Sequence, residues 1–348
     1  MHRAIVLLAV LGAALALTAG TAPPTPVGDV SYAYGARSEA PAMRLQSGQL
    51  FPGFTGGPVT AADGETVNVY VQDELLAADP GVPQRFADLL ASLLHGSELS
   101  TLTLDLATLD RVRQICGFGA LGCYSPRAMT IVAIGEDLRS IAARSVVTHE
   151  YGHHLANNRT NDPWPAVDWG TKRWASYVNI CKRAKGGELF PGDEAENYQF
   201  NPGEDFAENY RVLNERRAGV PEMPWQVVDP SLYPDQPALD LLAQDIATPW
   251  TGPTTSAVRS SFGPRATGRG FRIQTPLDGN FTATVRSPAG ARFTLRVVDL
   301  TTGGQLAYSA TATPTKTVSL QICGERTLQL QVKRVRGSGP FTLTFSQP

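Results

Sequence analysis

The sequence of 348 residues predicts an α+β domain followed by an all-β domain of the sandwich or jelly-roll class. The first part mixes helical and strand periodicities, which is typical of an α+β fold. From about Ser256 onward, apolar and polar residues alternate with a period of two between turns that carry Gly or Pro, as in an antiparallel sandwich. The expected segments are a signal peptide at 1–22, a linker or short pro-region at 23–62, the α+β domain at 63–252 and the β-sandwich at 256–348.

The amino terminus has the pattern of a secretory signal peptide. A short basic start, Met1-His2-Arg3, precedes an apolar run at Ala4–Leu17 and a small-residue exit, with cleavage expected near Ala19 or Ala22. The apolar run is shorter than the roughly 20 residues that span a membrane, although an uncleaved anchor is the alternative. We therefore expect a secreted, extracellular protein with no membrane span after the signal is removed.

The chain carries 30 Lys plus Arg and 32 Asp plus Glu. This balance of charge gives no electrostatic reason to expect nucleic acid as a partner.

Periodicity places the elements of the α+β domain. Seven prolines surround the last helix, so the stretch at 218–254 is expected to wrap the domain and end it. The expected strands are Thr66–Gln72, Leu102–Leu106 and Ala128–Ile134, and the expected helices are Pro83–His95, Leu109–Ile115 and Ala238–Ala247.

Residues 149–153 read His-Glu-Tyr-Gly-His, and they carry the strongest chemical signal in the chain. On a helix, His149 and His153 lie four residues apart on one face and can bind one Zn²⁺, while Glu150 can reach a zinc-bound water. A zinc-dependent hydrolase is the leading hypothesis. The alternative is a chance pattern on a surface helix. His154 points elsewhere and is interpreted as structural or solvent-exposed.

The surrounding residues favour a helix with defined ends. Ser140 is expected to cap its start, and Asn157 and Asn158 to stop it. A histidine that would continue the motif downstream is absent, because Ala156 and Arg159 occupy the relevant positions. This excludes a metzincin, so the third ligand must come from another element.

A second helix offers carboxylates at a suitable spacing. Asn201 suits the N-cap and Pro202 the first helical position. Glu204 and Glu208 then lie one turn apart, so the first could bind zinc and the second could accept a hydrogen bond from a ligand histidine. Asp205 points about 100° away around the helix. The alternative for Glu204 is a capping box that folds back on Asn201.

The two helices together resemble the gluzincin metallopeptidases, a zincin-like class. The Glu-x-Phe-Ala-Glu form at residues 204–208 is similar to the lethal-factor-like branch in particular, and the resemblance covers roughly residues 65 to 215. The resemblance implies that the catalytic base is Glu150 and that the ligands of one Zn²⁺ per chain are His149, His153 and Glu204.

The same resemblance implies two further features. Some relatives stabilise the oxyanion with a Tyr before the ligand Glu, and Tyr198 is the nearest match, unless it is a solvent-facing loop residue. A strand before the zinc helix edges the cleft in such enzymes and pairs with the substrate backbone. The strand at Ala128–Ile134 is the candidate here, and an ordinary interior strand is the alternative.

Four cysteines in an exported chain imply disulfides. Only six residues separate Cys116 from Cys123, so we expect these two to pair, which leaves Cys181 with Cys323. Proximity alone supports this choice among three connectivities.

Aromatic residues fill the insertion between the two site helices. They could line a pocket, but packing is the favoured interpretation; they are Trp164, Trp169, Trp174 and Tyr177.

The C-terminal part resembles the pre-peptidase C-terminal modules of secreted bacterial proteases, especially in its closing Gly-Pro-Phe-Thr-Leu-Thr-Phe. Such a module is expected to bind, stabilise or aid secretion, since it lacks histidine and any catalytic cluster. Its alternating runs are Phe271–Gln274, Phe281–Val285, Phe293–Val297, Val318–Ile322, Leu328–Val332 and Phe341–Phe345.

These features predict a secreted, monomeric zinc metalloendopeptidase that acts on a protein or peptide substrate through a zinc-bound water activated by Glu150. One alternative is a surface or extracellular binding protein in which the β-sandwich is the functional module and the zincin-like domain is structural or weakly active. Another is a zinc hydrolase of a non-protein bond. Ca²⁺ is a further candidate stabiliser, but no ligand run supports it.

Overall fold

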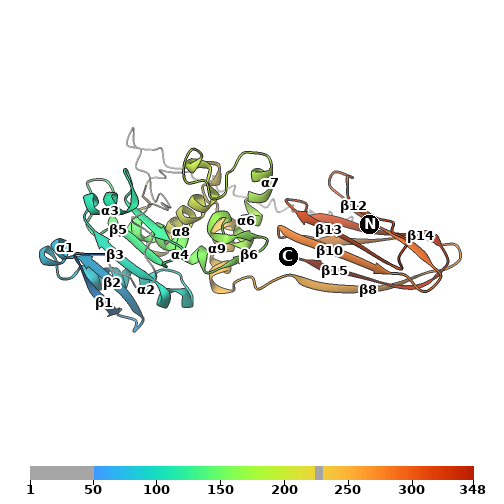
Figure 1. The fold of residues 1–348 in the computed structure, drawn as a ribbon, viewed down its shortest axis with the longest axis horizontal. Helices are drawn as coiled ribbons and strands as arrows, with labels where there is room; N and C mark the ends of the chain where they lie inside the picture. The colour runs from blue at the N-terminus through green and yellow to red at the C-terminus, as the bar shows by residue number, and fades with distance from the viewer. Residues whose placement is uncertain (1–50, 224–229) are drawn as a thin grey trace, which may run out of the picture.

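The computed structural model describes residues 51–223 and 230–348. The expected signal peptide and residues 23–50 of the expected linker lie outside this range. The described chain has an α/β N-terminal region and a C-terminal region of antiparallel sheets (Figure 1). No helix in the described ranges is both long enough and apolar enough to span a membrane.

The N-terminal region is built on a five-stranded sheet with the strand order β1-β2-β3-β5-β4. The three inner strands are mutually parallel, and the two edge strands run antiparallel to their neighbours. The strands are β1 (Phe54–Thr60), β2 (Thr66–Gln72), β3 (Thr103–Ala107), β4 (Gly122–Ser125) and β5 (Thr130–Ile134).

Strand β1 corrects the expectation that a linker or pro-region extends to residue 62. It pairs with β2 from Phe54 opposite Gln72 to Thr60 opposite Thr66, so the sheet already begins at residue 54. Two glycines and a proline in this strand hide its pattern. Gly56 has a structural reason, because a Cβ built there would lie 2.1 Å from the carbonyl oxygen of Val69.

Strand β4 corrects the assignment of the edge strand. The expected strand at Ala128–Ile134 forms β5, but it lies between β3 and β4 and is an interior strand. The edge position belongs to β4, which is four residues long and follows a glycine-rich loop. Such a short strand leaves too few residues for a readable alternation.

Nine helices are described in the two ranges. Five of them match expected helices to within a few residues, and the other four, at Asp73–Ala78, Ala166–Trp169, Lys172–Tyr177 and Ile180–Lys185, were not predicted. They are α1 (Asp73–Ala78), α2 (Val82–Ser92), α3 (Leu109–Cys116), α4 (Ala143–Asn157), α5 (Ala166–Trp169), α6 (Lys172–Tyr177), α7 (Ile180–Lys185), α8 (Pro202–Ala218) and α9 (Gln236–Ala247). Shorter elements are the 3₁₀ turns η2 (Ser97–Thr101), η3 (Tyr198–Phe200) and η4 (Pro230–Leu232), and the hairpin strands β6 (Thr160–Asn161) and β7 (Trp164–Pro165).

Helices cover both faces of the N-terminal sheet. Tyr124 of β4 points to the face that carries α4, where its hydroxyl lies 3.1 Å from Nδ1 of His154. Successive side chains of a strand point to opposite faces, so Cys123 points to the other face. There it forms a disulfide with Cys116 at the end of α3, as predicted.

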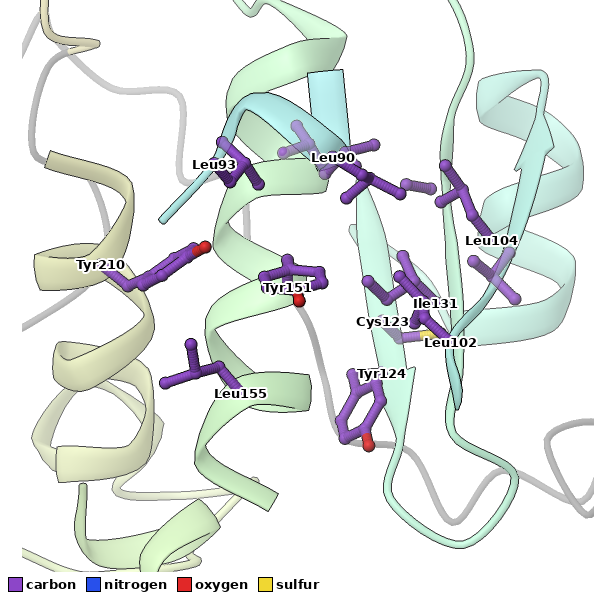
Figure 2. Close-up of a cluster of buried hydrophobic side chains, with 14 of the residues drawn as sticks. Leu90, Leu93, Leu102, Leu104, Cys123, Tyr124, Ile131, Tyr151, Leu155 and Tyr210 are labelled. Atoms are coloured by element: carbon purple, nitrogen blue, oxygen red, sulfur yellow. The ribbon is translucent and has the colours of Figure 1, made fainter. Parts of the chain in front are cut away.

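The core between the sheet, α4 and α8 is continuous. Figure 2 shows Tyr151 of α4 between Tyr210 of α8 and Ile131 of β5, and all three side chains are fully buried. Burying an aliphatic or aromatic side chain of this size contributes roughly 1.5–3 kcal/mol. The core therefore holds α4 firmly between the sheet and α8.

Helices α4 and α8 approach closely through a small residue on each. A Cβ built on Gly152 would lie 2.8 Å from Cα of Ala207, so the two backbones touch at this point. His149 and His153 lie three residues before and one residue after Gly152. Helical spacing puts these three on one face of α4, turned toward α8.

The C-terminal region consists of two four-stranded antiparallel sheets, ordered β13-β10-β15-β8 and β12-β11-β14-β9, with a separate apolar core, consistent with a β-sandwich. All six expected runs form strands. The alternation did not reveal β8, which starts at Thr254 and is mostly exposed, or β12. The strands are β8 (Thr254–Phe262), β9 (Gly268–Gln274), β10 (Gly279–Arg286), β11 (Arg292–Asp299), β12 (Gln305–Ser309), β13 (Thr315–Ile322), β14 (Thr327–Arg336) and β15 (Gly339–Gln347).

The two regions meet through polar contacts and one covalent bond. Cys181 of α7 forms a disulfide with Cys323, as predicted. Close by, Ser176 of α6 accepts a hydrogen bond from the backbone N–H of Asp278 at 2.9 Å through its hydroxyl, and its carbonyl accepts one from Arg326 at 2.5 Å.

Candidate metal centre

Helix α4 carries the His-Glu-Tyr-Gly-His motif, and it begins later than expected. Ser140 is not its cap, because the segment from Leu138 to Ile141 forms a tight bridge and the helix starts at Ala143. Asp137 supplies the missing cap from a distance, since its carboxylate accepts a hydrogen bond from the Ala143 N–H at 2.8 Å. The helix ends at Asn157, as expected.

Almost every side chain of α4 is buried, on its polar faces as well as its apolar ones. A helix with no solvent face lies in the core of a domain. The motif therefore does not sit on a surface helix. Its polar side chains must find their partners inside the protein.

Helix α8 begins as the sequence predicts. Asn201 caps it by accepting a hydrogen bond from the Gly203 N–H at 3.1 Å, and Pro202 takes the first helical position. The same Asn201 oxygen accepts a hydrogen bond from Gly192 at 3.0 Å, which ties the preceding loop to the helix start. Glu204 does not close a capping box with Asn201 and instead points toward α4.

His149, His153 and Glu204 converge at one point between the two helices. One ligand atom from each residue lies within 4.8 Å of the others. Oε2 of Glu204 is 3.3 Å from Nε2 of His149, and Oε1 is 3.4 Å from Nε2 of His153. Ligands on a tetrahedral zinc ion with bonds of about 2.0–2.1 Å are separated by roughly the same distance.

Glu150 lies beside this cluster without belonging to it. One residue of helix rotates it about 100° from His149, and its carboxylate faces strand β4. A Cβ built on Gly122 would lie 2.9 Å from Oε1 of Glu150, so the strand passes directly over the carboxylate. Neither oxygen of Glu150 has a hydrogen-bond partner in the described part of the chain, and burial raises its pKa to about 8.

Glu208 contacts the candidate ligand His149 on the side of the ring that faces away from Glu204. Its Oε1 lies 3.1 Å from Nδ1 of His149, on the ring nitrogen that faces away from Glu204. Arg211 donates from Nε to Oε2 of Glu208 at 2.7 Å and pairs through Nη1 with Glu215 at 2.5 Å. Glu215 also accepts a hydrogen bond from the hydroxyl of Ser145, at 2.6 Å.

The sequence did not reveal the Arg211–Glu215 part of this network. Arg211 reads as an ordinary charged helix residue, three residues beyond Glu208 and four before Glu215. Ion pairs at these spacings are common on exposed helices. No sequence signal marks Arg211, because its burial follows from the packing of α8 and is seen only in the structure.

The electrostatics of the cluster are dominated by carboxylates. Burial acts to lower the pKa of His149, but hydrogen bonds to Glu204 and Glu208 raise it to about 10. Burial acts to raise the pKa of both carboxyls, yet His153 and His149 lower that of Glu204, and Arg211 and His149 lower that of Glu208. Buried anions around two imidazoles create a site that favours a positive charge.

Tyr198 lies next to the cluster. It belongs to the turn η3, and its hydroxyl donates to Oε2 of Glu204 at 2.8 Å. It is half-buried, so it is not a solvent-facing loop residue. Asp205, by contrast, is buried on α8 outside the ligand cluster, in agreement with its helical position.

His154 has a structural environment, as interpreted from the sequence. Its ring lies 3.1 Å from the Tyr124 hydroxyl and 2.9 Å from the carbonyl oxygen of Glu98. Burial lowers its pKa, so the neutral ring is favoured. His154 therefore ties α4 to β4 and to the turn η2.

The aromatic residues of the insertion pack rather than line a cavity at the cluster. Trp174 is fully buried and donates to the side chain of Asn209 on α8 at 3.2 Å. Trp164 and Trp169 stack with their ring centroids 4.9 Å apart. Tyr177 is partly exposed and donates to Asp235 at 2.7 Å.

The donor set fits a zinc ion. Two imidazoles and one carboxylate are the ligands found in catalytic zinc sites that keep a position open for water. The ring nitrogens of His153 form no hydrogen bond within the described residues, although they are buried. Buried polar atoms require partners, and a cation between the three side chains would supply one.

The comparisons with known proteins leave the family open. No protein-family model matches the chain, and no curated protein matches it. A crystal structure of the pre-peptidase C-terminal domain of a collagenase from Bacillus anthracis shares 16% identity over 26% of this chain and 88% of that domain, with a TM-score of 0.23.

Two further solved structures match at similar levels. The Yersinia pseudotuberculosis-derived mitogen shares 9% identity over 28% of this chain and 87% of that chain, with a TM-score of 0.23. PliG, a periplasmic inhibitor of g-type lysozyme from Aeromonas hydrophila, shares 12% identity over 26% of this chain and 84% of that chain, with a TM-score of 0.21. We therefore base the functional proposal on the site itself.

Proposed function

We propose that this protein is a zinc-dependent metalloendopeptidase of the gluzincin type. The observation that carries the proposal is the convergence of His149, His153 and Glu204. Beside it lies the carboxylate of Glu150 on α4, which has no hydrogen-bond partner among the described residues. A structural metal site needs no such neighbour. A buried acid beside a metal site is suited to moving a proton.

Each residue of the proposed site has a separate role in peptide-bond hydrolysis. His149, His153 and Glu204 would hold the zinc ion, and zinc held there supplies the Lewis acidity that polarises a scissile carbonyl and makes an attacking water more acidic. Glu150 takes the proton of that water on its carboxylate and later donates it to the leaving amine nitrogen. Tyr198 is the proposed oxyanion donor: its hydroxyl donates to Oε2 of Glu204 at 2.8 Å and would have to turn from that oxygen to the developing oxyanion.

Strand β4 is the proposed binding edge for the substrate backbone. In the described part of the chain β4 pairs with one strand, β5, so its other edge has no partner strand there, although the side chains of β4 are buried. An extended peptide can add to such an edge through main-chain hydrogen bonds. The contact between Gly122 and Glu150 would bring a peptide paired there to the catalytic base.

The cellular context and the C-terminal region complete the proposal. Two disulfides favour an oxidising compartment, which agrees with the expected signal peptide and with a secreted enzyme. The metal-ligand cluster lies wholly in the N-terminal region, so the sandwich is proposed as an accessory module of the pre-peptidase C-terminal type that binds substrate or aids stability.

The test combines metal content with activity. Protein purified without chelator should contain one zinc ion per chain by elemental analysis and should cleave casein and quenched fluorescent peptides. Glu150→Gln should keep the zinc and the fold and lose about 10²–10⁴-fold in kcat. Glu74→Gln, a change at an exposed acid on α1, is the matched control.

Three results would separate this proposal from its alternatives. Absence of zinc would reject the metal site. Zinc without peptide cleavage, together with Glu150-dependent hydrolysis of esters or other non-peptide substrates, would assign a different bond. Zinc with no hydrolysis of any of these substrates would favour a binding protein.

A further inference from the structure

We propose that Phe118, at the tip of the disulfide loop before β4, is a substrate-recognition residue that contacts an apolar side chain of a peptide bound along β4. This inference rests on the proposed function, because it names what that function recognises. The pattern that suggests it is exposure: Phe118 is 101% exposed, whereas Ala120 and Leu121 in the same loop are buried.

The exposure of Phe118 is extreme for this molecule. The other exposed large apolar side chains among the described residues range from 37% to 55%. Leaving a phenylalanine in water forgoes roughly 1.5–3 kcal/mol of burial free energy. A side chain held so far out is available for contact with a partner.

The loop holds Phe118 outward through its backbone and its covalent bond. Gly117 and Gly119 flank it with φ angles of +113° and +88°, which other residues rarely adopt. The N–H of Ala120 donates to the carbonyl oxygen of Gly117 at 3.3 Å and closes a tight turn. The disulfide between Cys116 and Cys123, with their Cα atoms 5.8 Å apart, clamps the base of the loop.

The position of the loop links Phe118 to the site. The carbonyl oxygen of Leu121 accepts a hydrogen bond from Ile134 at 3.0 Å, so the pairing of β4 with β5 starts directly after the tip. Gly122, the next residue, contacts Glu150. Phe118 is four residues from Gly122 and thus within about 14 Å of it along the chain. A peptide of a few residues paired with β4 can span that distance.

The size of the exposed surface favours a peptide over a second copy of the chain. One aromatic side chain offers about 150–250 Å². A stable protein–protein interface needs about 800 Å² on each partner. A single side chain of the substrate, aliphatic or aromatic, matches the area that Phe118 presents.

The test compares apolar and polar peptides of the same length. In the apolar peptides each position that flanks the cleaved bond is Leu or Phe in turn, and in the polar peptide these positions are Ser. Phe118→Ala should raise KM for the apolar peptides by about 3- to 10-fold, leave kcat within about twofold and leave the Ser peptide unchanged. Phe118→Trp should restore the wild-type KM. Tyr308→Ala, which removes an exposed aromatic from β12, is the control.

A binding measurement separates this inference from the proposed function. In the Glu150→Gln background, fluorescence anisotropy should show weaker binding of the apolar peptide when Phe118 is also Ala. If the wild type cleaved no peptide, the proposed function would fail, and the anisotropy would still decide the role of Phe118. The inference would be overturned if the apolar peptide bound with equal affinity with and without the Phe118 side chain. It would also be overturned if sedimentation showed a concentration-dependent dimer that Phe118→Ala abolishes.

Discussion

Gly152 of α4 lies directly against Ala207 of α8, where a Cβ on the glycine would approach Cα of the alanine to 2.8 Å. The two small residues occupy equivalent places in their motifs. His149 and His153 are three residues before and one after Gly152, and Glu204 and Glu208 stand in the same relation to Ala207. One close backbone contact therefore sets the histidines opposite the carboxylates.

Gly152→Ala should disturb both stability and metal binding. The added methyl group meets backbone, which cannot turn aside, so the helices must separate at an expected cost of about 1–3 kcal/mol. Zinc affinity should fall at least about tenfold, since the ligands move with the helices. Thermal unfolding and competition with a chromophoric chelator measure the two effects. Gly263→Ala, where the structure leaves open space, is the control, and an unchanged zinc affinity in Gly152→Ala would contradict the prediction.

Glu208→Ala should weaken zinc binding by about 10–100-fold, because Glu208 orients the His149 ring through its far nitrogen. Metal-free protein should remain folded, so the loss should appear in chelator competition rather than in circular dichroism. If Glu208→Ala bound zinc with wild-type affinity, Glu208 would have a purely structural role.

Arg211→Gln should have a larger effect on stability than on zinc affinity. It leaves Glu208 and Glu215 buried without their shared cation, and breaking a buried pair costs about 3–5 kcal/mol. Urea denaturation gives the value. Arg216→Gln on the same helix removes a partly exposed pair with Glu222, so it should cost less than about 1 kcal/mol. Equal losses in the two variants would show that the buried network adds nothing.

Tyr198→Phe separates two roles of one hydroxyl. If it stabilises the oxyanion, kcat should fall by about 10²–10³-fold while zinc affinity stays within about threefold. The comparison variant is Tyr177→Phe, which removes another hydroxyl bonded to a carboxylate, that of Asp235. A drop in zinc affinity with unchanged kcat at saturating zinc would instead mean that Tyr198 orients Glu204.

Asp105 should make stability depend on pH. It is buried in β3, its Oδ1 has no hydrogen-bond partner within the described residues, and burial raises its pKa to about 7. An unfolded Asp has a pKa of about 3.9, so the folded state binds the proton more tightly. Its stability contribution is fully present below about pH 4 and is lost as the pH rises to about 7.

Asp105→Asn should remove that loss. The variant should gain on the order of 1–3 kcal/mol over the wild type at pH 8 and little at pH 4. Urea denaturation at both pH values measures the difference. The same gain at both would show that the carboxyl does not titrate in this range.

How far the sequence predicts this structure can be judged residue by residue. The alternation at Thr66–Gln72 and the cap and proline at Asn201 and Pro202 locate their elements because local chemistry alone decides them. The His-Glu-Tyr-Gly-His spacing likewise identifies residues that the helix must place on one face. The order of the strands depends on long-range pairing, so the edge position of β4 could not be read from its four residues.

Partners across the fold were also hidden from the sequence. No residue near Gly152 in the sequence indicates its contact with Ala207. The cap of α4 comes from Asp137 rather than from Ser140, which is nearer in the sequence. Such contacts depend on how helices pack, which a single sequence does not record. They nevertheless fix where the candidate ligands meet.

The bond between Cys181 and Cys323 spans a separation of 142 residues, which includes helix α8 and the proline-rich stretch before the sandwich. A single proteolytic cut anywhere in that interval would leave two polypeptides joined as one molecule. Such a nicked form would migrate as one species under non-reducing electrophoresis and as two after reduction. The disulfide would thus keep the C-terminal region attached to the N-terminal region after the backbone is broken.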